Sequence, residues 1–482
     1  MSKNQLLPIA VDLDGTLVKT DTLYECCLQL LHHHCLKIFL LPLWLIHGKA
    51  YLKQKVSERV NLNLTTLPYN LELISWLKNQ KVLGHQIILI TAANYQVADA
   101  IANHLKLFDE VIASKDQINM AGLKKRQHLV ERYGEKQFIY VGNSKIDLTV
   151  WQSAAQAVVV NASADLHKKV ASLTDITKNF PSTSITPRAW RQVLRIHQYF
   201  KNILLFVPII AAHQSSHIQS INLLFLAFVS FSLCASSVYI INDLFDLESD
   251  RQHPQKCFRP FAAGIVSIKY GVILASICLL ASVAIASLVG NHFLIWLITY
   301  IALTYAYSLK LKRLVIIDCL VLATLYTLRI IAGAAAISIA LSFWLLAFSI
   351  FLFLSLSFVK RYGELAIHIL KEATYAHGRG YHVSDASLIQ TLGITAGYTA
   401  VLLLALYLNS ETVMNLYAAP QLIWLTIPIM LFWISWMWLK AHRGEMHHDP
   451  IQFALQDKAS LVSGLLLLII YTLATNYSMT YA

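Results

Sequence analysis

The sequence predicts two fold classes in one chain, an N-terminal α/β domain followed by an all-α membrane domain of nine transmembrane helices. The first indication is composition: hydrophobic residues make up 56% of the 482 residues and charged residues only 14%, against about 25% charged in soluble proteins. The mean hydropathy is +0.53. The second indication is order along the chain, because short β-type runs alternate with helical patterns and long apolar segments follow them.

The α/β prediction depends on four short apolar runs of the kind that form buried strands. Helical patterns separate these runs, which favours a parallel sheet with crossover helices. A stretch rich in Pro, Ser and Thr then predicts a break, so we expect an α/β domain at 1–180, a linker at 181–198 and a membrane domain at 199–482. The four predicted strands lie near residues 9–11, 86–90, 138–141 and 157–160.

The membrane prediction depends on nine apolar segments, each close to the roughly 20 residues that a helix needs to cross a bilayer. A buried soluble core supplies one or two such runs, and nine are more than such a core accounts for. The segments lie near residues 199–217, 219–241, 270–289, 291–308, 314–337, 341–358, 388–409, 420–439 and 459–477.

Basic residues predict the topology of this domain. Fourteen Lys and Arg residues lie in the loops after the second, fourth, sixth and eighth segments, and the loops between the others contain none. The positive-inside rule then puts the α/β domain in the cytosol and the C-terminus on the opposite side, and we expect a bacterial inner membrane. The net charge of +12 suits an anionic membrane and phosphorylated substrates. Because the sequence has no helix-turn-helix or zinc-finger pattern, we expect no nucleic-acid partner.

Two shorter segments have two interpretations each. Residues 36–46 are apolar but too short to span, so they form either a core or cap helix or a helix that rests on the membrane surface. Residues 377–381, with two glycines, form either a loop that closes over a site or a plain connection.

The segment 242–250 carries the strongest functional signal. Asp243, Asp246 and Asp250 are spaced i, i+3, i+7, so a helix presents all three on one face. Carboxylates this close repel one another unless a cation lies between them, and hard oxygen ligands that leave room for substrate phosphates suit Mg²⁺. Lys256 and Arg259 supply positive charge for phosphate oxygens. Acidic residues at a membrane boundary are costly, which favours a site over a solvated helix end.

A second acidic pair follows the first predicted strand. Asp12 and Asp14 occupy alternate positions and therefore share a face. One carboxylate can attack phosphorus, and the other can protonate the leaving oxygen. The ends of parallel strands meet at one edge of a sheet, where ligands bind. The other polar residues that we expect at this edge are Thr91, Lys125, Asn143 and Asp147.

Residues 5–165 resemble the haloacid dehalogenase (HAD) phosphatase superfamily, through the DLDGT sequence at 12–16 and the ordered motifs after it. The resemblance implies a HAD-like Rossmannoid fold with Asp12 as nucleophile and Asp14 as general acid/base. Members of the superfamily often have an acid where this chain has Asn143, and the alternative is a retained fold that serves as a scaffold without turnover. By the same resemblance Thr91 binds phosphate, Lys125 neutralises the phosphoryl charge, and Asp12, Asp14, Asn143 and Asp147 hold Mg²⁺.

The nine segments and the aspartate spacing resemble the UbiA prenyltransferase superfamily over about residues 190–480. Most members hold an isoprenoid diphosphate through Mg²⁺ on two Asp-rich motifs and attach the prenyl chain to an aromatic acceptor. Here the first motif is complete, whereas Asp318 stands alone at the place of the second. Arg329 follows in an otherwise apolar helix, where an arginine without a purpose is costly.

The extended pattern over 242–264 looks closest to one branch, the decaprenyl-phosphate phosphoribosyltransferases. In that branch the diphosphate belongs to the sugar donor 5-phosphoribosyl-1-diphosphate (PRPP), and a polyprenyl phosphate is the nucleophile. The resemblance implies that Asp243 and Asp246 serve catalysis and, with Asp250, bind Mg²⁺. The residues that it implies for substrate binding are Asn242, Lys256, Arg259, Tyr307, Lys312, Asp318, Arg329, Lys360 and Arg361.

The leading hypothesis is Mg²⁺-dependent transfer of 5-phosphoribose from PRPP to a polyprenyl phosphate at the cytosolic face, with the HAD domain removing the 5-phosphate. The first alternative is a UbiA-type prenyltransferase that attaches a polyprenyl chain from its diphosphate to an aromatic acceptor such as hydroxybenzoate. A different class is a lipid transporter or membrane scaffold with a degenerate HAD domain, which leaves the cluster of Asp, Lys and Arg unexplained. The sequence leaves the oligomeric state open.

Overall fold

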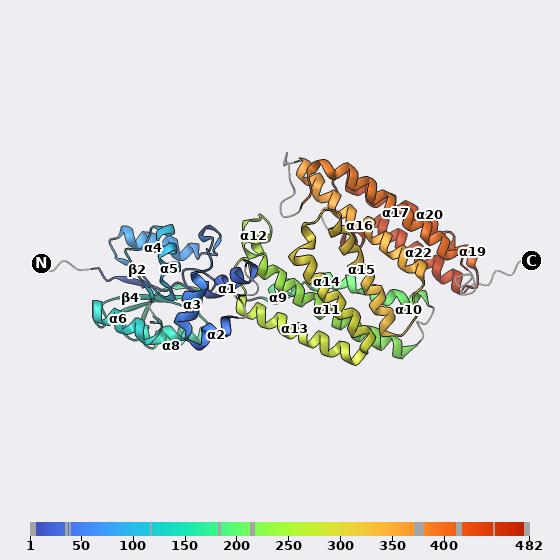
Figure 1. Ribbon diagram of the computed structural model, residues 1–482. Coiled ribbons are helices and arrows are strands. Elements are labelled where there is room, and N and C mark those ends of the chain that lie inside the picture. Colours follow the sequence, from blue (N-terminus) through green and yellow to red (C-terminus); the bar gives the residue numbers. More distant parts are fainter. Residues whose placement is uncertain are drawn as a thin grey trace, which may run out of the picture. The chain divides into compact units, whose positions relative to one another are not determined.

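The computed structural model describes residues 6–33, 37, 40–115, 118–181, 185–212, 217–370, 380–410, 417–446 and 449–476. The chain forms two compact units, whose elements are labelled in Figure 1. The first unit comprises Met1–Arg195 and Tyr239–Ser276, and the second comprises Ile196–Val238 and Ile277–Ala482. The first unit therefore contains the α/β domain together with residues 242–264, which we call the acid-rich segment.

A six-stranded sheet of order β3-β2-β1-β4-β5-β6 forms the centre of the first unit, and all its neighbouring strands are parallel. The chain builds β2 and β3 on one side of β1 and then adds β4 on the other side, so the strand order reverses at β1. Residues that follow β1 and β4 therefore lie at the switch point where open parallel sheets bind ligands. The strands are β1 (Ile9–Val11), β2 (Ile87–Asn94), β3 (Glu110–Ser114), β4 (Ile139–Gly142), β5 (Gln156–Val160) and β6 (Asp175–Phe180).

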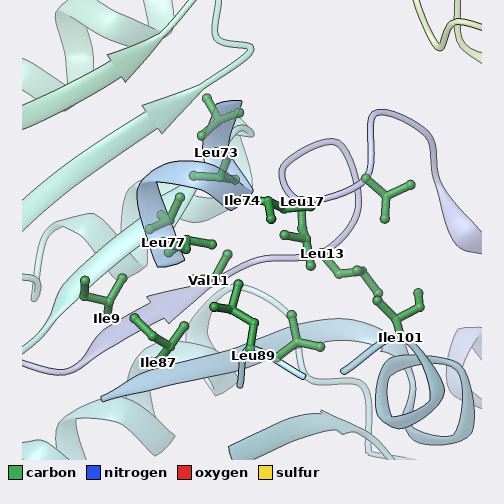
Figure 2. Close-up of a cluster of buried hydrophobic side chains, with 14 of the residues drawn as sticks. Ile9, Val11, Leu13, Leu17, Leu73, Ile74, Leu77, Ile87, Leu89 and Ile101 are labelled. Atoms are coloured by element: carbon green, nitrogen blue, oxygen red, sulfur yellow. The ribbon is translucent and has the colours of Figure 1, made fainter. Parts of the chain in front are cut away.

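Two hydrophobic clusters cover the two faces of this sheet, because alternate residues of a strand point to opposite faces. Ile9 and Val11 belong to one cluster and Ala10 to the other. Figure 2 shows the first cluster, in which Leu73 and Leu77 pack with the side chains of β1 and β2. Burial on both faces makes such strands continuous apolar runs, which is why the sequence located β1, β2, β4 and β5.

The segment between β1 and β2 inserts several helices into the α/β domain. Within it, α2 buries Trp44, whereas Leu43, Leu45 and Ile46 are exposed by 54%, 50% and 79%. Residues 34–36 and 38–39 lie outside the described part of the chain, so both interpretations of 36–46 stay hypotheses. The helices of this unit are α1 (Thr22–His33), α2 (Leu41–Ile46), α3 (Lys49–Ser57), η2 (Leu64–Thr66), α4 (Leu71–Val82), α5 (Tyr95–Leu105), α6 (Leu123–Tyr133), η3 (Lys145–Asp147), α7 (Leu148–Trp151), α8 (Ala164–Ala171), α9 (Pro187–Val193), α12 (Leu247–Gln252) and η5 (Lys256–Phe258).

Among the residues that the structure describes, eight helices are long and apolar enough to cross a membrane. The number is nine if the bent pair formed by α9 and η4–α10 counts as one span. The predicted all-α membrane domain is confirmed. The eight are α11 (Ile218–Phe245), α13 (Ile268–Val289), α14 (Asn291–Leu309), α15 (Ile317–Ala336), α16 (Phe343–Leu370), α17 (Ala386–Leu408), α20 (Thr426–His442) and α22 (Lys458–Asn476), and the shorter helices are η4 (Ile196–Phe206), α10 (Val207–Ala211), η6 (Leu311–Arg313), η7 (Val383–Asp385), α19 (Pro420–Ile423) and α21 (Pro450–Ala454).

Two helix boundaries differ from the sequence prediction. The helix expected to carry all three aspartates is interrupted, because α11 ends at Phe245 and α12 begins at Leu247. Conversely, α16 continues to Leu370, so Lys360 and Arg361 lie within a helix and the loop that we expected for them begins later. Acidic partners satisfy both of these charges, which removes the reason to end the helix there.

Small residues allow helices of the second unit to approach closely. A Cβ on Gly333 of α15 would lie 2.1 Å from the carbonyl oxygen of Leu205, so α15 and η4 meet backbone to backbone. A Cβ on Gly393 of α17 would lie 2.2 Å from the ring of Trp438 in α20. Small residues at helix contacts are typical of membrane bundles. The contact at Gly333 fixes η4 against the helix that carries Arg329.

Candidate active sites

A buried series of polar groups links Asp12 to Asp147 at the switch point of the sheet. Lys125 of α6 donates from Nζ to Asp12 Oδ1 at 2.7 Å and to the Tyr140 hydroxyl at 3.1 Å. The Tyr140 hydroxyl in turn donates to Asp147 Oδ1 at 2.8 Å. Each of these four side chains belongs to a residue less than 9% exposed. The structure thus brings together three residues that the sequence assigned to one site, with Tyr140 as an additional member.

Asp147 is also held by its own turn. Its Oδ2 accepts from the backbone nitrogens of Asn143 and Ser144 at 3.3 and 3.0 Å and from the Ser144 hydroxyl at 2.8 Å. The amide of Asn143 lies over Gly15, where φ is +75° and a Cβ would come within 2.0 Å of Asn143 Nδ2. Only glycine fits such a position. Thr91 lies within β2, which continues past it to Asn94, and its hydroxyl accepts from the backbone nitrogen of Ala93 at 3.0 Å.

The two carboxylates of the DLDGT loop have different surroundings. Burial raises the pKa of Asp12 to about 6, although the charge of Lys125 opposes the increase. Burial raises the pKa of Asp14 to about 7, and the negative charge of Asp21 adds to it. Asp14 Oδ1 also accepts from the backbone nitrogen of Thr22, the first residue of α1, at 2.8 Å. A carboxyl group with a pKa near 7 can hold a proton for a leaving group while its neighbour is ionised, as nucleophilic attack requires.

Lys53 is a residue of this region that sequence reasoning missed. It lies on α3 of the insert and donates from Nζ to the carbonyl oxygen of Ala92 at 2.5 Å. Burial lowers its pKa, and the carboxylates of Asp14, Asp21 and Asp12 oppose that effect. A small cleft beside it is also lined by residues of α1 and α5. Lysine is common on exposed helix faces, so the sequence carries no signal that would have singled it out.

The acid-rich segment forms a second cluster in the first unit. Arg259 donates from Nη1 to Asp243 Oδ1 at 3.1 Å and to Asp250 Oδ2 at 2.7 Å, and Arg195 also donates to Asp243 Oδ1. Asp243 and Asp250 are only 5% and 2% exposed. Burial raises the pKa of Asp250, and Arg259 opposes that increase. The two carboxylates therefore share the guanidinium group of Arg259, and Asp243 binds that of Arg195 as well. Sequence reasoning placed Arg195 in a linker and missed it.

Three further predicted residues lie beside this cluster. Asp246 is the N-cap residue of α12, and helical backbone bonds from Asp246 to Asn242 (2.9 Å) and from Asp250 to Asp246 (2.8 Å) continue across the interruption. Asn242 is half-buried in α11, and Lys256 is exposed at the start of η5. Within the described residues no group of three His, Cys, Asp or Glu side chains is arranged to hold a metal ion. The donors that are present, carboxylate oxygens flanked by arginines, nevertheless fit Mg²⁺ bound together with a diphosphate.

In the second unit, Arg329 is buried inside α15. It donates from Nε to Asn202 Oδ1 at 3.0 Å, from Nη1 to the carbonyl oxygen of Leu325 at 2.6 Å and from Nη2 to the Tyr300 hydroxyl at 2.9 Å. Its guanidinium carbon lies 4.9 Å from the centre of the Tyr300 ring. These contacts fix the orientation of a positive charge within an apolar helix, as the sequence led us to expect for a functional arginine.

Asp318 and Arg361 form a buried pair in the same unit. Arg361 donates to Asp318 and to Glu364, and the Tyr381 hydroxyl also donates to Asp318. The side chains of Asp318 and Arg361 are 0% and 1% exposed. The backbone nitrogen of Ile316, a β-branched residue at φ +68°, donates to the Tyr381 hydroxyl at 2.8 Å. These contacts occupy the carboxylate of Asp318, whose role as a substrate ligand stays a prediction.

A third cluster of this unit surrounds Asp449, which sequence reasoning missed. Its Oδ2 accepts from Lys201 Nζ at 2.9 Å and from Lys360 Nζ at 3.3 Å. The ammonium group of Lys201 lies 5.6 Å from the centre of the Tyr326 ring, which Arg329 also approaches to 5.4 Å. Lys201 belongs to an apolar segment that we interpreted as the first span, and a lysine there was the signal that could have found it.

The remaining predicted residues lie near the end of α14. Tyr307 is half-buried, and its hydroxyl accepts from Arg361 Nη2 at 3.4 Å. Lys312 is half-buried in η6. Most of the segment 377–381 lies outside the described residues, so its two interpretations stay open. Its last residue, Tyr381, is described and buried.

Comparison with known proteins assigns both parts of the chain to relatives. Residues 203–456 match the model of the UbiA prenyltransferase family. The uncharacterized protein y4nM of Sinorhizobium fredii is 34% identical over 97% of this chain and 91% of its own length. Decaprenyl-phosphate phosphoribosyltransferase of Mycobacterium tuberculosis is 28% identical over 55% of this chain and 87% of its own length. A predicted phosphoglycolate phosphatase from Haemophilus somnus 129pt matches 33% of this chain and 86% of its own at 20% identity and a TM-score of 0.24. The expected UbiA family membership of the membrane domain is confirmed, and the HAD-like character of the N-terminal domain stays a prediction.

Proposed function

Because the chain belongs to the UbiA prenyltransferase family, we propose that its membrane domain transfers 5-phosphoribose from PRPP to a polyprenyl phosphate in a Mg²⁺-dependent reaction. The observation that carries the proposal is the cluster in which Arg259 binds both Asp243 and Asp250 and Arg195 binds Asp243. Such a cluster suits a diphosphate, which needs cations on its oxygens and a metal ion between it and the carboxylates. The similarity to a phosphoribosyltransferase over 87% of that enzyme supports PRPP as the donor.

The residues of the cluster have separate roles in this proposal. Asp243, Asp246 and Asp250 would hold Mg²⁺, which when bound neutralises a leaving diphosphate. Arg259 and Arg195 exchange their carboxylate partners for diphosphate oxygens, and planar guanidinium groups suit such bidentate contacts. The bond from C1 of ribose to the diphosphate breaks, and a bond from C1 to the lipid phosphate oxygen forms. That oxygen is already an anion, so the step needs little help from a general base.

The second unit has a cluster of cations of its own that is suited to binding phosphate. Lys201 and Lys360 share the single carboxylate of Asp449, so the three charges sum to a positive value. Arg329 adds a further guanidinium beside Tyr326. We assign these three residues to the binding of a phosphate group. An enzyme of this kind is a multi-pass membrane protein, and the distribution of Lys and Arg supports the cytosolic side for its N-terminal domain.

The HAD-like domain would then remove the 5-phosphate from the lipid-linked product. Asp12 attacks phosphorus, the bond from phosphorus to O5 of ribose breaks, and Asp14 gives its proton to O5. Water then hydrolyses the aspartyl phosphate, with Asp14 taking the proton. Lys125, which donates to Asp12 at 2.7 Å, is placed to stabilise the charge of the phosphoryl oxygens. The raised pKa of Asp14, to about 7, supports its role as the acid.

The experiment is incubation of the purified full-length protein with Mg²⁺, PRPP labelled in the ribose and a polyprenyl phosphate, followed by organic extraction and mass analysis. We expect label in the lipid phase and its loss in Asp243→Asn, whereas Asp165→Asn, at an exposed aspartate of α8, retains it. Asp12→Asn should leave the 5-phosphate on the product. A protein that labels no lipid from PRPP but joins a prenyl diphosphate to hydroxybenzoate would overturn the proposal in favour of aromatic prenyl transfer.

A further inference from the structure

The insert of the HAD-like domain is in contact with the acid-rich segment inside the first unit. Glu25, in the first turn of α1, accepts from Arg251 Nη2 at 2.6 Å and from Nη1 at 3.2 Å. Both side chains are 7% exposed, so this is a buried, bidentate pair. Arg251 also donates from Nε to the carbonyl oxygen of Ala262 at 3.2 Å. The arginine next to Asp250 is therefore bound by a residue of the phosphatase-like domain.

Two further contacts join the same two segments. Asn63 Nδ2 of the insert donates to Glu248 Oε1 at 2.7 Å. A Cβ on Gly264, at φ +69°, would lie 2.8 Å from Lys19 Cβ. A hydrophobic cluster lies around these contacts, in which Tyr24 and Leu28 of α1 pack with residues of α11, α12 and α13. The insert therefore determines where α12 lies, and this six-residue helix is too short to hold its own position.

The contacts form a continuous path between the two clusters of carboxylates. At one end, the backbone of Thr22 binds Asp14, and Glu25 follows one turn later on α1. At the other end, Arg251 is adjacent to Asp250, which shares Arg259 with Asp243. Because a buried charge needs its partner, movement of Glu25 displaces Arg251 and with it Asp250. We propose that Glu25, a residue of the HAD-like domain, is a positioning residue for the diphosphate site of the transferase.

The inference rests on the proposed function, since it requires that the Asp243 cluster binds Mg²⁺-diphosphate. The test is calorimetric titration of inorganic diphosphate with Mg²⁺ into the full-length protein, in which Asp243→Asn identifies the heat that belongs to this cluster. We expect Glu25→Gln to weaken the Asp243-dependent binding about tenfold, within the range of coupling energies between sites. Glu72→Gln, at an exposed glutamate of α4, is the matched control and should bind as the wild type does.

Calorimetry separates positioning from simple loss of structure. A contact that only stabilises the fold would lower the fraction of binding-competent protein and leave the dissociation constant unchanged. The charge-swapped double variant Glu25→Arg/Arg251→Glu should recover most of the affinity that each single change removes. If Asp243-dependent binding is present and Glu25→Gln leaves its dissociation constant unchanged, the inference fails and the proposed function stands. If diphosphate binding is the same in Asp243→Asn as in the wild type, both fail.

Discussion

Asp318 takes the place of a second acidic motif, and a mutant cycle can decide whether it is a ligand or an anchor. Its carboxylate accepts from Arg361, from Tyr381 and from the backbone nitrogen of Cys319, the last at 2.8 Å. Asp318→Asn removes the charge from the group that pairs with a fully buried arginine. Breaking a buried pair costs about 3–5 kcal/mol. Because Glu364 remains bound to Arg361, we expect the lower end, about 3 kcal/mol, for this variant.

The cycle adds Arg361→Met and the double variant. Arg361→Met removes the guanidinium partner of the buried Asp318 carboxylate and also breaks the contact with Glu364, so we expect about 5 kcal/mol, the upper end. The double variant removes both charges and should cost less than the sum of the singles by about 1–3 kcal/mol. The assay is unfolding of the purified protein in mixed micelles, followed by tryptophan fluorescence. Additive losses, or an Asp318→Asn protein of unchanged stability that no longer binds donor, would refute the anchor role and restore the ligand role.

Three further predictions concern other parts of the chain. Since the pKa of folded Asp14 is raised to about 7, its contribution to stability is favourable only at low pH. That contribution is lost as pH rises from about 4 towards 7. The hydrogen-exchange protection of β1 in the metal-free protein should therefore decline over this range, and it should decline less in Asp14→Asn than in the wild type. Gly333→Ala, with a Cβ 2.1 Å from a carbonyl oxygen, should destabilise the second unit by more than about 1 kcal/mol in the same unfolding assay, whereas Gly464→Ala, which meets nothing within 4 Å, should not. Lys53→Met should raise the KM for p-nitrophenyl phosphate hydrolysis more than it lowers kcat, and an unchanged KM would exclude a role in substrate binding.

The sequence predicted the parts of the fold that local patterns determine. Strand β1 and its buried neighbours are apolar runs, and the spans are long apolar helices, so both were visible without coordinates. Strand β6 was not predicted, because four of its residues 175–179 are polar or charged and most of them are exposed at the edge of the sheet. The continuation of α16 through Lys360 was not predicted either, because the charge of Lys360 is satisfied by Asp449, which is far away in the sequence.

The candidate sites show the same difference between residues found by local patterns and residues that depend on long-range contacts. Asp12 and Asp14 were found because their spacing alone places them after a buried strand. Lys201 and Glu25 were missed, since their importance comes from partners that no local pattern identifies. The single helix expected over the three aspartates is interrupted at Asp246, and the flanking backbone bonds keep nearly the helical spacing. A sequence pattern therefore located the acidic groups, and only the structure identified the arginines between them.

The contact between Glu25 and Arg251 has a consequence for biosynthesis, because the two residues are 226 positions apart. At about 5–20 residues per second, a ribosome needs on the order of 10 to 50 s to add that length. The N-terminal sheet can fold during this interval, while the apolar side chains of Tyr24 and Leu28 still await the segment that covers them. Until the residues of α11, α12 and α13 have been added, these side chains lack the apolar partners that cover them in the folded unit, and the nascent domain exposes an apolar surface.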